Sequence, residues 1–184
     1  MEIKKILLPG CYEMQAHLFC DERGTFVKTY QKRIFAEYHL ETDFVEQYYS
    51  VSKHRVIRGL HFQIPPHEHT KVVYCVLGSV LDAVGDLRVG SPTYGHYATL
   101  ELDADKANMI YIPAGIAHGF YVLSETAILV YNVTSAHSPR HDIGIRWDSM
   151  GIPWPDAEPI VSARDLALVS FANFQSPFRF KGDG

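Results

Sequence analysis

The most constraining feature of this 184-residue chain is a succession of short segments rich in β-branched and aromatic residues, punctuated by glycine or proline. Such segments favour β-strands, because these side chains pack well on a pleated surface and the intervening residues favour turns. Strands are predicted at residues 25–30, 45–52, 56–63, 71–77, 80–84, 97–102, 109–112, 119–123 and 127–134. Many short strands at this spacing predict an all-β sandwich or barrel.

Helical periodicity is confined to two short stretches. In residues 32–40, Ile34, Phe35 and Tyr38 fall on one helical face. In residues 162–171, a serine and an aspartate three residues later have the spacing of a capping box. We therefore expect one or two small helices beside the β-structure.

The composition is that of an ordinary globular protein, with 47% hydrophobic and 21% charged residues. No linker, repeat or low-complexity tract divides the chain, so we predict one domain over residues 1–184. The formal net charge of −4 leaves no basic excess to neutralise a phosphate backbone, which argues against nucleic acid as a partner. A mononucleotide remains compatible with this charge, because two arginines suffice for a diphosphate.

The cysteines and the apolar stretches indicate in which cellular compartment the protein is located. Cys11, Cys20 and Cys75 lack metal-ligand spacing and are predicted to be buried thiols in a reducing environment. The apolar run within residues 1–10 is too short for a signal peptide. Residues 72–84 are interrupted by polar residues and a glycine, so they predict a pair of strands rather than a membrane span. We expect a cytoplasmic protein without a membrane partner.

The histidines suggest a metal site that the neighbouring residues argue against. His67 and His69 form an H-x-H pair, and His118 ends a P-A-G-I-A-H run two strands later. Together these resemble the two motifs of metal-binding cupins, which carry a carboxylate a few residues after the pair. This chain has Lys71 there, and a lysine beside a divalent metal is electrostatically unfavourable. We predict a polar loop without a metal, with a metal-dependent cupin oxygenase as the alternative.

One predicted strand has the composition of a pocket wall. Period-2 alternation predicts Arg58, Leu60 and Phe62 on one face, and Gly59, His61 and Gln63 on the other. A histidine and a glutamine on that second face can point into a barrel lumen, although a strand histidine is more often structural. Lys71, Tyr131 and Asp165 have ordinary explanations too, as a solvated strand end, a core tyrosine and a helix cap. No nucleophilic-serine, P-loop or dinucleotide fingerprint is present.

A set of motifs nevertheless occurs in a specific order. They are D-E-R-G-T-F from Asp21, R-G-L-H-F-Q from Arg58, D-L-R from Asp86, S-P-T-Y-G from Ser91, I-P-A-G-I-A-H-G-F from Ile112, G-I-R-W from Gly144, W-P from Trp154 and S-A-R-D from Ser162. In this order they resemble the dTDP-4-dehydrorhamnose 3,5-epimerase family, from Asp21 to Asp165. The resemblance implies a cupin-type jelly roll, a double-stranded β-helix, that needs neither metal nor cofactor.

The resemblance implies a reaction on a nucleotide-linked 4-keto-6-deoxy sugar of the dTDP-4-dehydro-6-deoxyglucose type. The C4 ketone acidifies the protons on C3 and C5, and one or both of these carbons are inverted. By resemblance, His61 is the base and is paired with Asp165, Lys71 stabilises the enolate oxygen, and Tyr131 returns a proton to the opposite face. These roles match what proton abstraction and enolate stabilisation need. A keto-isomerase and a non-catalytic sugar-binding cupin are the alternatives.

The resemblance also implies a set of substrate-binding residues. Arg23 and Arg58 are implied to hold the diphosphate, since guanidinium geometry suits paired oxygens. The other implied positions are Phe26, Lys28, Gln47, Tyr49, Asp82 and His118. Family members usually have glutamate at the position of Lys28, and an ammonium can only donate hydrogen bonds. The resemblance implies a dTDP-linked substrate, because the family mostly uses this nucleotide. A CDP-linked substrate is the alternative, because a donor at Lys28 would suit the acceptors of cytosine.

Two further implications concern the pocket's surroundings. A pair of family tyrosines is replaced here by Ala136 and His137, on what the resemblance implies is the nucleotide side. The family builds its pocket with an exchanged N-terminal strand, so a homodimer is implied in which Arg23 reaches the other subunit.

Overall fold

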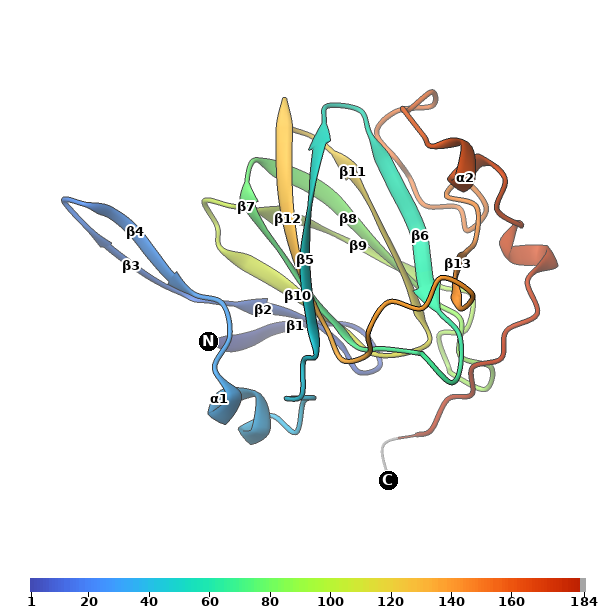
Figure 1. The fold of residues 1–184 in the computed structure, drawn as a ribbon, viewed down its shortest axis with the longest axis horizontal. Helices are drawn as coiled ribbons and strands as arrows, with labels where there is room; N and C mark the ends of the chain where they lie inside the picture. The colour runs from blue at the N-terminus through green and yellow to red at the C-terminus, as the bar shows by residue number, and fades with distance from the viewer. Residues whose placement is uncertain (183–184) are drawn as a thin grey trace.

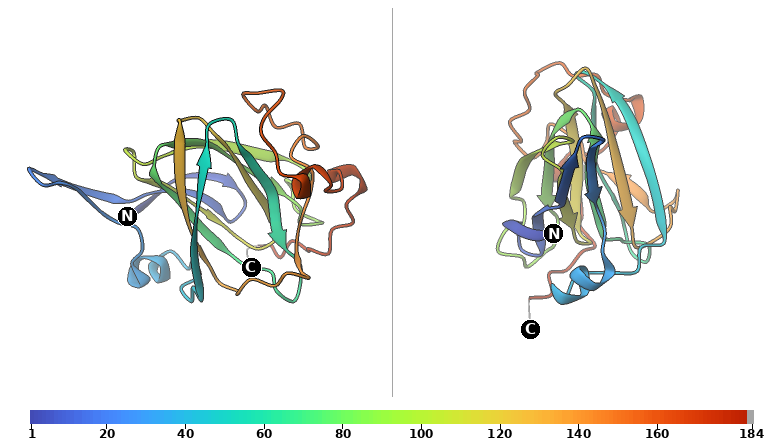
Figure 2. Two further views of the ribbon diagram at one scale, coloured as in Figure 1. Left: turned by 45° about the horizontal axis from the view of Figure 1, so that its top comes forward. Right: turned by 90° about the vertical axis from the view of Figure 1, so that its left-hand side faces the viewer.

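The computed structural model describes residues 1–182 and, within that range, shows two antiparallel sheets packed face to face and a separate two-stranded ribbon (Figure 1). The right-hand view of Figure 2 shows the sheets nearly edge on, with the ribbon drawn toward the viewer. This architecture confirms the prediction of an all-β jelly roll with short helices.

Neighbouring strands in each sheet come from distant parts of the chain. The larger sheet contains, in order of pairing, β1 (Glu2–Leu8), β2 (Cys11–Gln15), β10 (Asn108–Ile112), β7 (Lys71–Leu77), β12 (Thr126–Val133) and β5 (Glu46–Lys53). The smaller sheet contains, in the same sense, β13 (Asp142–Gly144), β6 (Ile57–Gln63), β11 (Ile116–Val122), β8 (Ser79–Asp86) and β9 (Tyr97–Asp103). The ribbon consists of β3 (His17–Asp21) and β4 (Gly24–Lys28), and the helical segments are α1 (Lys32–Glu37), α2 (Ala163–Leu166) and the 3-10 turn η1 (Phe171–Asn173).

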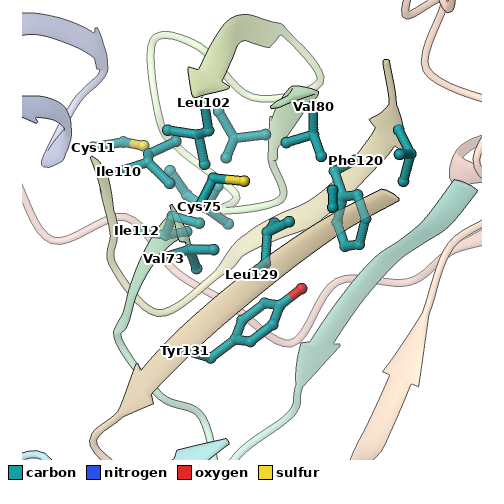
Figure 3. Packing of buried hydrophobic residues seen from close by; sticks show 14 of the residues in the cluster. Cys11, Val73, Cys75, Val80, Leu102, Ile110, Ile112, Phe120, Leu129 and Tyr131 are labelled. Carbon is teal, nitrogen blue, oxygen red and sulfur yellow. The ribbon is translucent and has the colours of Figure 1, made fainter. Parts of the chain in front are cut away.

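The main core fills the space between the sheets. Val73 and Leu129 from the larger sheet and Val84 and Phe120 from the smaller sheet are each at most 1% exposed. Figure 3 shows Val73, Phe120 and Leu129 in one cluster of apolar side chains, with Tyr131 at its margin. Each fully buried side chain of this size contributes about 1.5–3 kcal/mol by leaving water. The core therefore holds the strands rigidly where they pass beside the polar residues described below.

Both sheets are partly covered on their outer faces. α1 places Phe35, which is fully buried, against the larger sheet, with its ring centroid 6.4 Å from that of Tyr111. The C-terminal segment covers the smaller sheet, and the rings of Phe174 and Phe178 lie 5.2 and 5.7 Å from that of Phe62. The C-terminal aromatic residues thus pack within their own subunit.

Several predictions need correction in detail. The helix expected over 162–171 is shorter, because α2 spans Ala163–Leu166 and η1 follows after a break. The predicted cap is confirmed, since the backbone N–H of Asp165 donates to Oγ of Ser162 at 3.1 Å. All three cysteines are free, but Cys20 is exposed rather than buried. It lies on β3, which projects away from the sheets and is exposed along its length.

The ribbon of β3 and β4 extends away from the body of the protein (Figure 1; Figure 2, left). Its apolar residues Leu18, Phe19 and Phe26 are 38%, 54% and 59% exposed. A two-stranded ribbon is only marginally stable alone in water, and exposed apolar side chains of this kind are commonly buried against another protein surface. The ribbon therefore has the character of an interface. No helix within residues 1–182 is long and apolar enough to cross a membrane.

Candidate active site

A pocket of about 400 Å³ lies between the two sheets, beside the apolar core. Five of the predicted residues line it: Arg58, His61, Lys71, His118 and Tyr131. His61 and His118 belong to the smaller sheet, and Lys71 and Tyr131 belong to the larger one. Residues that are far apart in the sequence, such as His61 and Tyr131, are therefore brought to one cavity by the facing sheets.

A bulge in β6 sets which of its residues reach the pocket. In the pairing of β6 with β11, Phe120 lies opposite Arg58 and His118 lies opposite His61, so the register shifts between them. Such a shift changes the side of the strand on which the following residues point. The prediction that Arg58 shares a face with Leu60 is therefore wrong. Leu60 is fully buried, whereas Arg58 lines the pocket together with His61.

Gly59 lies within this bulge and has a backbone conformation that favours glycine. Its φ angle is +132°, and a Cβ built there would lie 2.6 Å from Cα of Gly119 on β11. The backbones of β6 and β11 therefore approach too closely for any side chain at this position. The N–H of Gly59 donates to Oδ2 of Asp165 at 3.2 Å, so the bulge also anchors that carboxylate.

His61 and Asp165 form a hydrogen-bonded pair, in agreement with the predicted pairing. Nε2 of His61 lies 2.8 Å from Oδ1 of Asp165, and the side chains are 26% and 4% exposed. Burial alone would raise the pKa of Asp165, but the hydrogen bonds from His61 and Gly59 and the charge of His61 outweigh it and lower that pKa. An ionised carboxylate only accepts, so Nε2 of His61 carries a proton, and in the neutral imidazole the lone pair lies on Nδ1.

Lys71 is buried and has no carboxylate partner among the ion pairs recorded for residues 1–182. Its Nζ donates to the backbone carbonyl of His61 at 3.2 Å. Burial lowers the pKa of Lys71 to about 8, although the charges of Asp142 and Asp82 oppose this shift. Lys71 is therefore not the solvated strand end that the sequence allowed as its ordinary explanation. A buried cation without a counterion at a pocket is suited to an anion that develops there.

Tyr131 lies on the opposite wall from His61 and retains its phenolic proton. Its hydroxyl lies 3.4 Å from Oγ of Ser50, and its ring stacks on that of Tyr48 with centroids 4.8 Å apart. The side chain is 7% exposed, and burial raises its pKa above the ordinary value of 10.0. Tyr131 is both a member of the apolar core and part of the pocket lining.

A second histidine–aspartate pair lies deeper in the molecule. Nε2 of His118 is 2.7 Å from Oδ2 of Asp82, with side chains 4% and 0% exposed. Burial raises the pKa of Asp82, while His118 and Lys71 act to lower it. Oδ1 of Asp82 is buried without a hydrogen-bond partner among the described residues. Asp82 does not line the pocket but lies behind His118, just as Asp165 lies behind His61.

The other predicted binding residues do not reach the pocket of their own subunit. Arg23, Phe26 and Lys28 lie on the projecting ribbon, where Arg23 is 85% exposed and pairs with its neighbour Asp21. Gln47 and Tyr49 lie on β5 but are absent from the pocket lining. Gln47 instead donates from Nε2 to Oδ1 of Asn132 at 2.6 Å. Tyr49 is 69% exposed.

Several further residues line the pocket. Gln63 and His137 do so in agreement with the sequence, which indicated the lumen for Gln63 and the nucleotide side for His137. The lining residues that were not predicted as site residues are Glu46, Tyr48, Ser50, His69, Phe120, Val133, Ser135, Asp142 and Arg164. Period-2 alternation along β5 could have found the first three, because it places them on the face opposite to Gln47 and Tyr49. Arg164 forms an ion pair with Asp142 at 3.0 Å, and its only signal was its position beside Asp165.

His67 and His69 occupy different surroundings from one another. The ring of His67 packs on that of His141, with centroids 4.4 Å apart. His69 lines the pocket, and its Nδ1 lies 3.1 Å from Nε2 of Gln63. Burial lowers the pKa of His69 to about 3, so it is neutral. No group of three or more histidine, cysteine or acidic residues within residues 1–182 has an arrangement that could hold a metal ion.

The two walls of the pocket differ in chemistry: one carries groups that can accept a proton, and the other carries groups that can donate one. The smaller sheet presents imidazole groups held by carboxylates, and the larger sheet presents an ammonium group and a phenol. A planar or ring-shaped ketone between these walls would meet a base on one face, a proton donor on the other and a cation beside its oxygen. This arrangement is suited to removing and returning a proton next to a carbonyl group.

The comparisons with known proteins agree with this chemistry. Residues 5–173 match the family model described as dTDP-4-dehydrorhamnose 3,5-epimerase. A dTDP-4-dehydrorhamnose 3,5-epimerase from Shigella flexneri is 36% identical over 90% of this chain and 93% of the relative. A dTDP-6-deoxy-D-glucose-3,5-epimerase from Legionella pneumophila, solved with dTDP-4-keto-L-rhamnose, has a TM-score of 0.92 at 30% identity and covers 98% of both chains. A 3'-monoepimerase from Streptomyces bikiniensis, solved with dTDP-quinovose, has a TM-score of 0.84 at 30% identity and covers 90% of this chain and 85% of its own.

Proposed function

The chain belongs to the dTDP-4-dehydrorhamnose 3,5-epimerase family and is a sugar-nucleotide epimerase of the isomerase class, and from this premise we propose that the pocket between the sheets is its active site. His61 is the general base, and Asp165 is the positioning residue that fixes its tautomer. The carboxylate at Nε2 leaves the Nδ1 lone pair free for a substrate proton and stabilises the imidazolium that forms. The observation that carries this proposal is the 2.8 Å pair beside the buried Lys71.

Proton abstraction proceeds next to the C4 ketone. His61 takes a proton from the carbon beside the carbonyl, the electron pair of that bond forms a carbon–carbon double bond, and the C4 oxygen becomes negative. Lys71 stabilises this oxygen with its ammonium charge, which is already in place and shielded from water. Tyr131 then delivers a proton to the opposite face of the carbon, which inverts its configuration.

Deuterium exchange tests this assignment directly. With dTDP-4-keto-6-deoxyglucose in heavy water, the wild-type enzyme is expected to incorporate deuterium beside the ketone. His61→Asn is expected to slow that incorporation by about 10²–10⁴-fold, the usual contribution of a general base. His54→Asn is a matched control, because His54 is an exposed histidine outside the pocket. Wild-type enzyme that incorporates no deuterium would contradict the proposed reaction.

The nucleotide is a dTDP group, held in part by Arg58 at the pocket. Arg58 is exposed, and its Nε donates to Oγ of Ser52, which leaves guanidinium N–H groups for phosphate oxygens. Solved relatives contain TDP or dTDP-linked sugars, which supports this nucleotide. Calorimetric titration with dTDP, CDP, UDP and GDP tests it, with dTDP expected to bind most tightly. Tightest binding of CDP that is reversed in Lys28→Glu would favour the alternative.

The enzyme acts as a homodimer in which each ribbon reaches the partner's pocket. Support comes from the exposed apolar side chains of the ribbon, and from the outer face of the larger sheet, where Tyr49, Val51 and Val76 are 69%, 53% and 51% exposed. Exposed apolar surfaces such as these two are commonly buried in protein–protein interfaces. Light scattering at micromolar concentration is expected to give a dimer, and a monodisperse monomer would refute this assembly.

Mixing two inactive variants tests whether Arg23 acts in the partner's site. Arg23→Ala and His61→Asn lie on separate subunits of a mixed dimer. If Arg23 serves the partner, one site of that dimer carries both changes and the other site carries neither. We expect activity to reappear when the two variants are unfolded together and refolded. Two Arg23→Ala preparations treated in the same way are the control, and failure to recover activity would place Arg23 outside the partner's site.

A further inference from the structure

The hydroxyl of Tyr131 is held only loosely, whereas its ring is held by a flat aromatic contact. The hydroxyl lies 3.4 Å from Oγ of Ser50, which is long for two hydroxyl groups, whose usual separation is about 2.7–2.8 Å. The ring of Tyr48 lies almost parallel to that of Tyr131, with centroids 4.8 Å apart and planes inclined by 15°. The ring of His118, 6.1 Å away, meets Tyr131 only edge on. The stack on Tyr48 is therefore the contact that fixes the plane of the Tyr131 ring at the pocket.

This stack follows from the register of β5 on β12. Tyr48 and Tyr131 are direct partners in the antiparallel pairing of the two strands. Directly opposed residues of such a pair point to the same face, with Cβ atoms about 4.5–5.5 Å apart, and both tyrosines line the pocket. β5 is an edge strand of the larger sheet, so it has a neighbour on one side only. Tyr48 accordingly forms the outer half of the stack, at 40% exposed, and Tyr131 forms the inner half, at 7% exposed.

Neither core packing nor hydrogen bonding explains a tyrosine at this position. The apolar core between the sheets includes Tyr131 but not Tyr48. The hydroxyl of Tyr48 takes part in no hydrogen bond recorded within residues 1–182. A pocket wall at the sheet edge could equally carry a small polar side chain, as it does at Ser50. What Tyr48 contributes to this structure is its ring, and that ring contacts the proton donor.

We propose that Tyr48 is the positioning residue of the acid, and that its ring holds the phenol of Tyr131 where a proton reaches the far face of the carbon. The inference rests on the proposed function. Inversion requires that the proton arrives at one face of the carbon only. A displacement of about 1 Å can slow such a step by about 10²-fold. A ring that fixes the donor therefore acts on inversion and not on proton abstraction.

The enolate has two routes back to a ketone, and Tyr48 acts on one of them. The electron pair of the enolate takes a proton from His61, which retains the configuration, or from Tyr131, which inverts it. On the second route the O–H bond of Tyr131 breaks, a carbon–hydrogen bond forms, and the phenolate takes a proton from water. In heavy water, a base that has exchanged its proton with the solvent labels the carbon without inverting it. The ratio of inversion to label uptake thus reports on the acid separately from the base.

Three variants test the proposal through this ratio. Tyr48→Ala removes the ring, whereas Tyr48→Phe keeps the ring and removes only the hydroxyl. With dTDP-4-keto-6-deoxyglucose in heavy water, NMR measures label uptake and inverted product in one sample. Tyr48→Ala is expected to lower the ratio of inversion to label uptake by about 10²-fold, and Tyr48→Phe is expected to keep the wild-type ratio. Tyr97→Ala is the matched control, because Tyr97 is 39% exposed on β9 and lies outside the pocket.

A second set of variants guards against a change that acts through folding. Tyr48→Leu keeps an apolar side chain of moderate size without a flat ring, so it replaces Tyr48→Ala if that variant does not fold. A cooperative thermal transition well above the assay temperature shows that a variant is folded. In a Tyr131→Phe background the donor is absent, so adding Tyr48→Ala is expected to cause no further loss of inversion. A further loss there would show that Tyr48 acts by another route and would overturn the proposal.

The remaining outcomes separate this inference from the proposed function. An unchanged ratio in Tyr48→Ala would overturn positioning by the stack, as would an equal loss of inversion in Tyr48→Ala and Tyr48→Phe. A raised KM as the only change in Tyr48→Ala would also overturn it, because that result is typical of a residue that only binds the substrate. Wild-type enzyme that takes up no label beside the ketone would instead overturn the proposed function itself.

Discussion

Replacing Lys71 with methionine is expected to make the protein more stable at neutral pH while abolishing catalysis. Lys71 is 6% exposed and has no carboxylate partner among the ion pairs recorded within residues 1–182, and burial lowers its pKa from 10.5 to about 8. One pKa unit corresponds to about 1.4 kcal/mol, so holding the charged form in the folded protein costs roughly 3 kcal/mol. The variant also loses the hydrogen bond to the carbonyl of His61, which is worth about 1 kcal/mol. The net gain is about 1–3 kcal/mol.

The pH dependence of this gain follows from proton binding. The folded protein releases the Lys71 proton near pH 8, whereas the unfolded chain holds it up to about pH 10.4. Between these values the unfolded chain binds more protons, so wild-type stability rises with pH and the advantage of Lys71→Met shrinks. Urea unfolding at about pH 7 and about pH 10, at equal protein concentration, measures both effects.

Lys53→Met is the matched control, because Lys53 is exposed at the end of β5 and is expected to change stability little at either pH. A Lys71→Met variant that is less stable than wild type at neutral pH would refute the reasoning. So would a stability difference that is the same at both pH values.

The remaining predictions concern turnover. His61→Asn is expected to lower turnover by about 10²–10⁴-fold, measured by coupled assay of the epimerised product. Asp165→Asn is expected to lower turnover less, by about 10- to 150-fold, because it removes a charge-assisted hydrogen bond of about 1.5–3 kcal/mol but leaves the base. A loss of turnover equal to that of His61→Asn would contradict this. Tyr131→Phe is expected to keep deuterium exchange while inverted product becomes scarce, and normal inversion would assign the acid role elsewhere. Wild-type turnover is expected to fall above about pH 8 as Lys71 loses its proton, and a pH profile that stays flat to pH 10 would argue against that role.

The fold was predictable where apolar, β-branched and aromatic residues form a continuous run that the sheets bury. β7 was predicted at its observed bounds, because its apolar run begins at a lysine and ends at a glycine turn. Four strands were not predicted, namely β1, β2, β3 and β13. β3 is exposed throughout, β1 mixes lysines with isoleucines on a mostly exposed edge, and β2 and β13 are only five and three residues long. Edge and projecting strands carry little periodic signal, because no core selects one of their faces.

The candidate site was predictable in composition but not in geometry. The resemblance indicated His61 and Asp165, and the fold brings them within 2.8 Å. Strict alternation misplaced Arg58, because it cannot anticipate a bulge, which is fixed by pairing with β11. The likeness between the two histidine–aspartate pairs was equally unpredictable, since it depends on strand register. Register is a property of the assembled sheet rather than of any single segment.

The carboxylate that orients His61 comes from a part of the chain 104 residues later, beyond the last strand of either sheet. Both sheets can therefore form and bury their core before Asp165 is in place. During refolding, fluorescence of the buried aromatic residues is expected to recover before enzymatic turnover. A nascent or proteolytically shortened chain that ends before α2 would contain the pocket and His61 but lack the carboxylate that orients the base, so it would bind its ligand and turn it over more slowly. Full activity therefore requires a chain that extends through α2, although neither sheet contains a strand from that part of the chain.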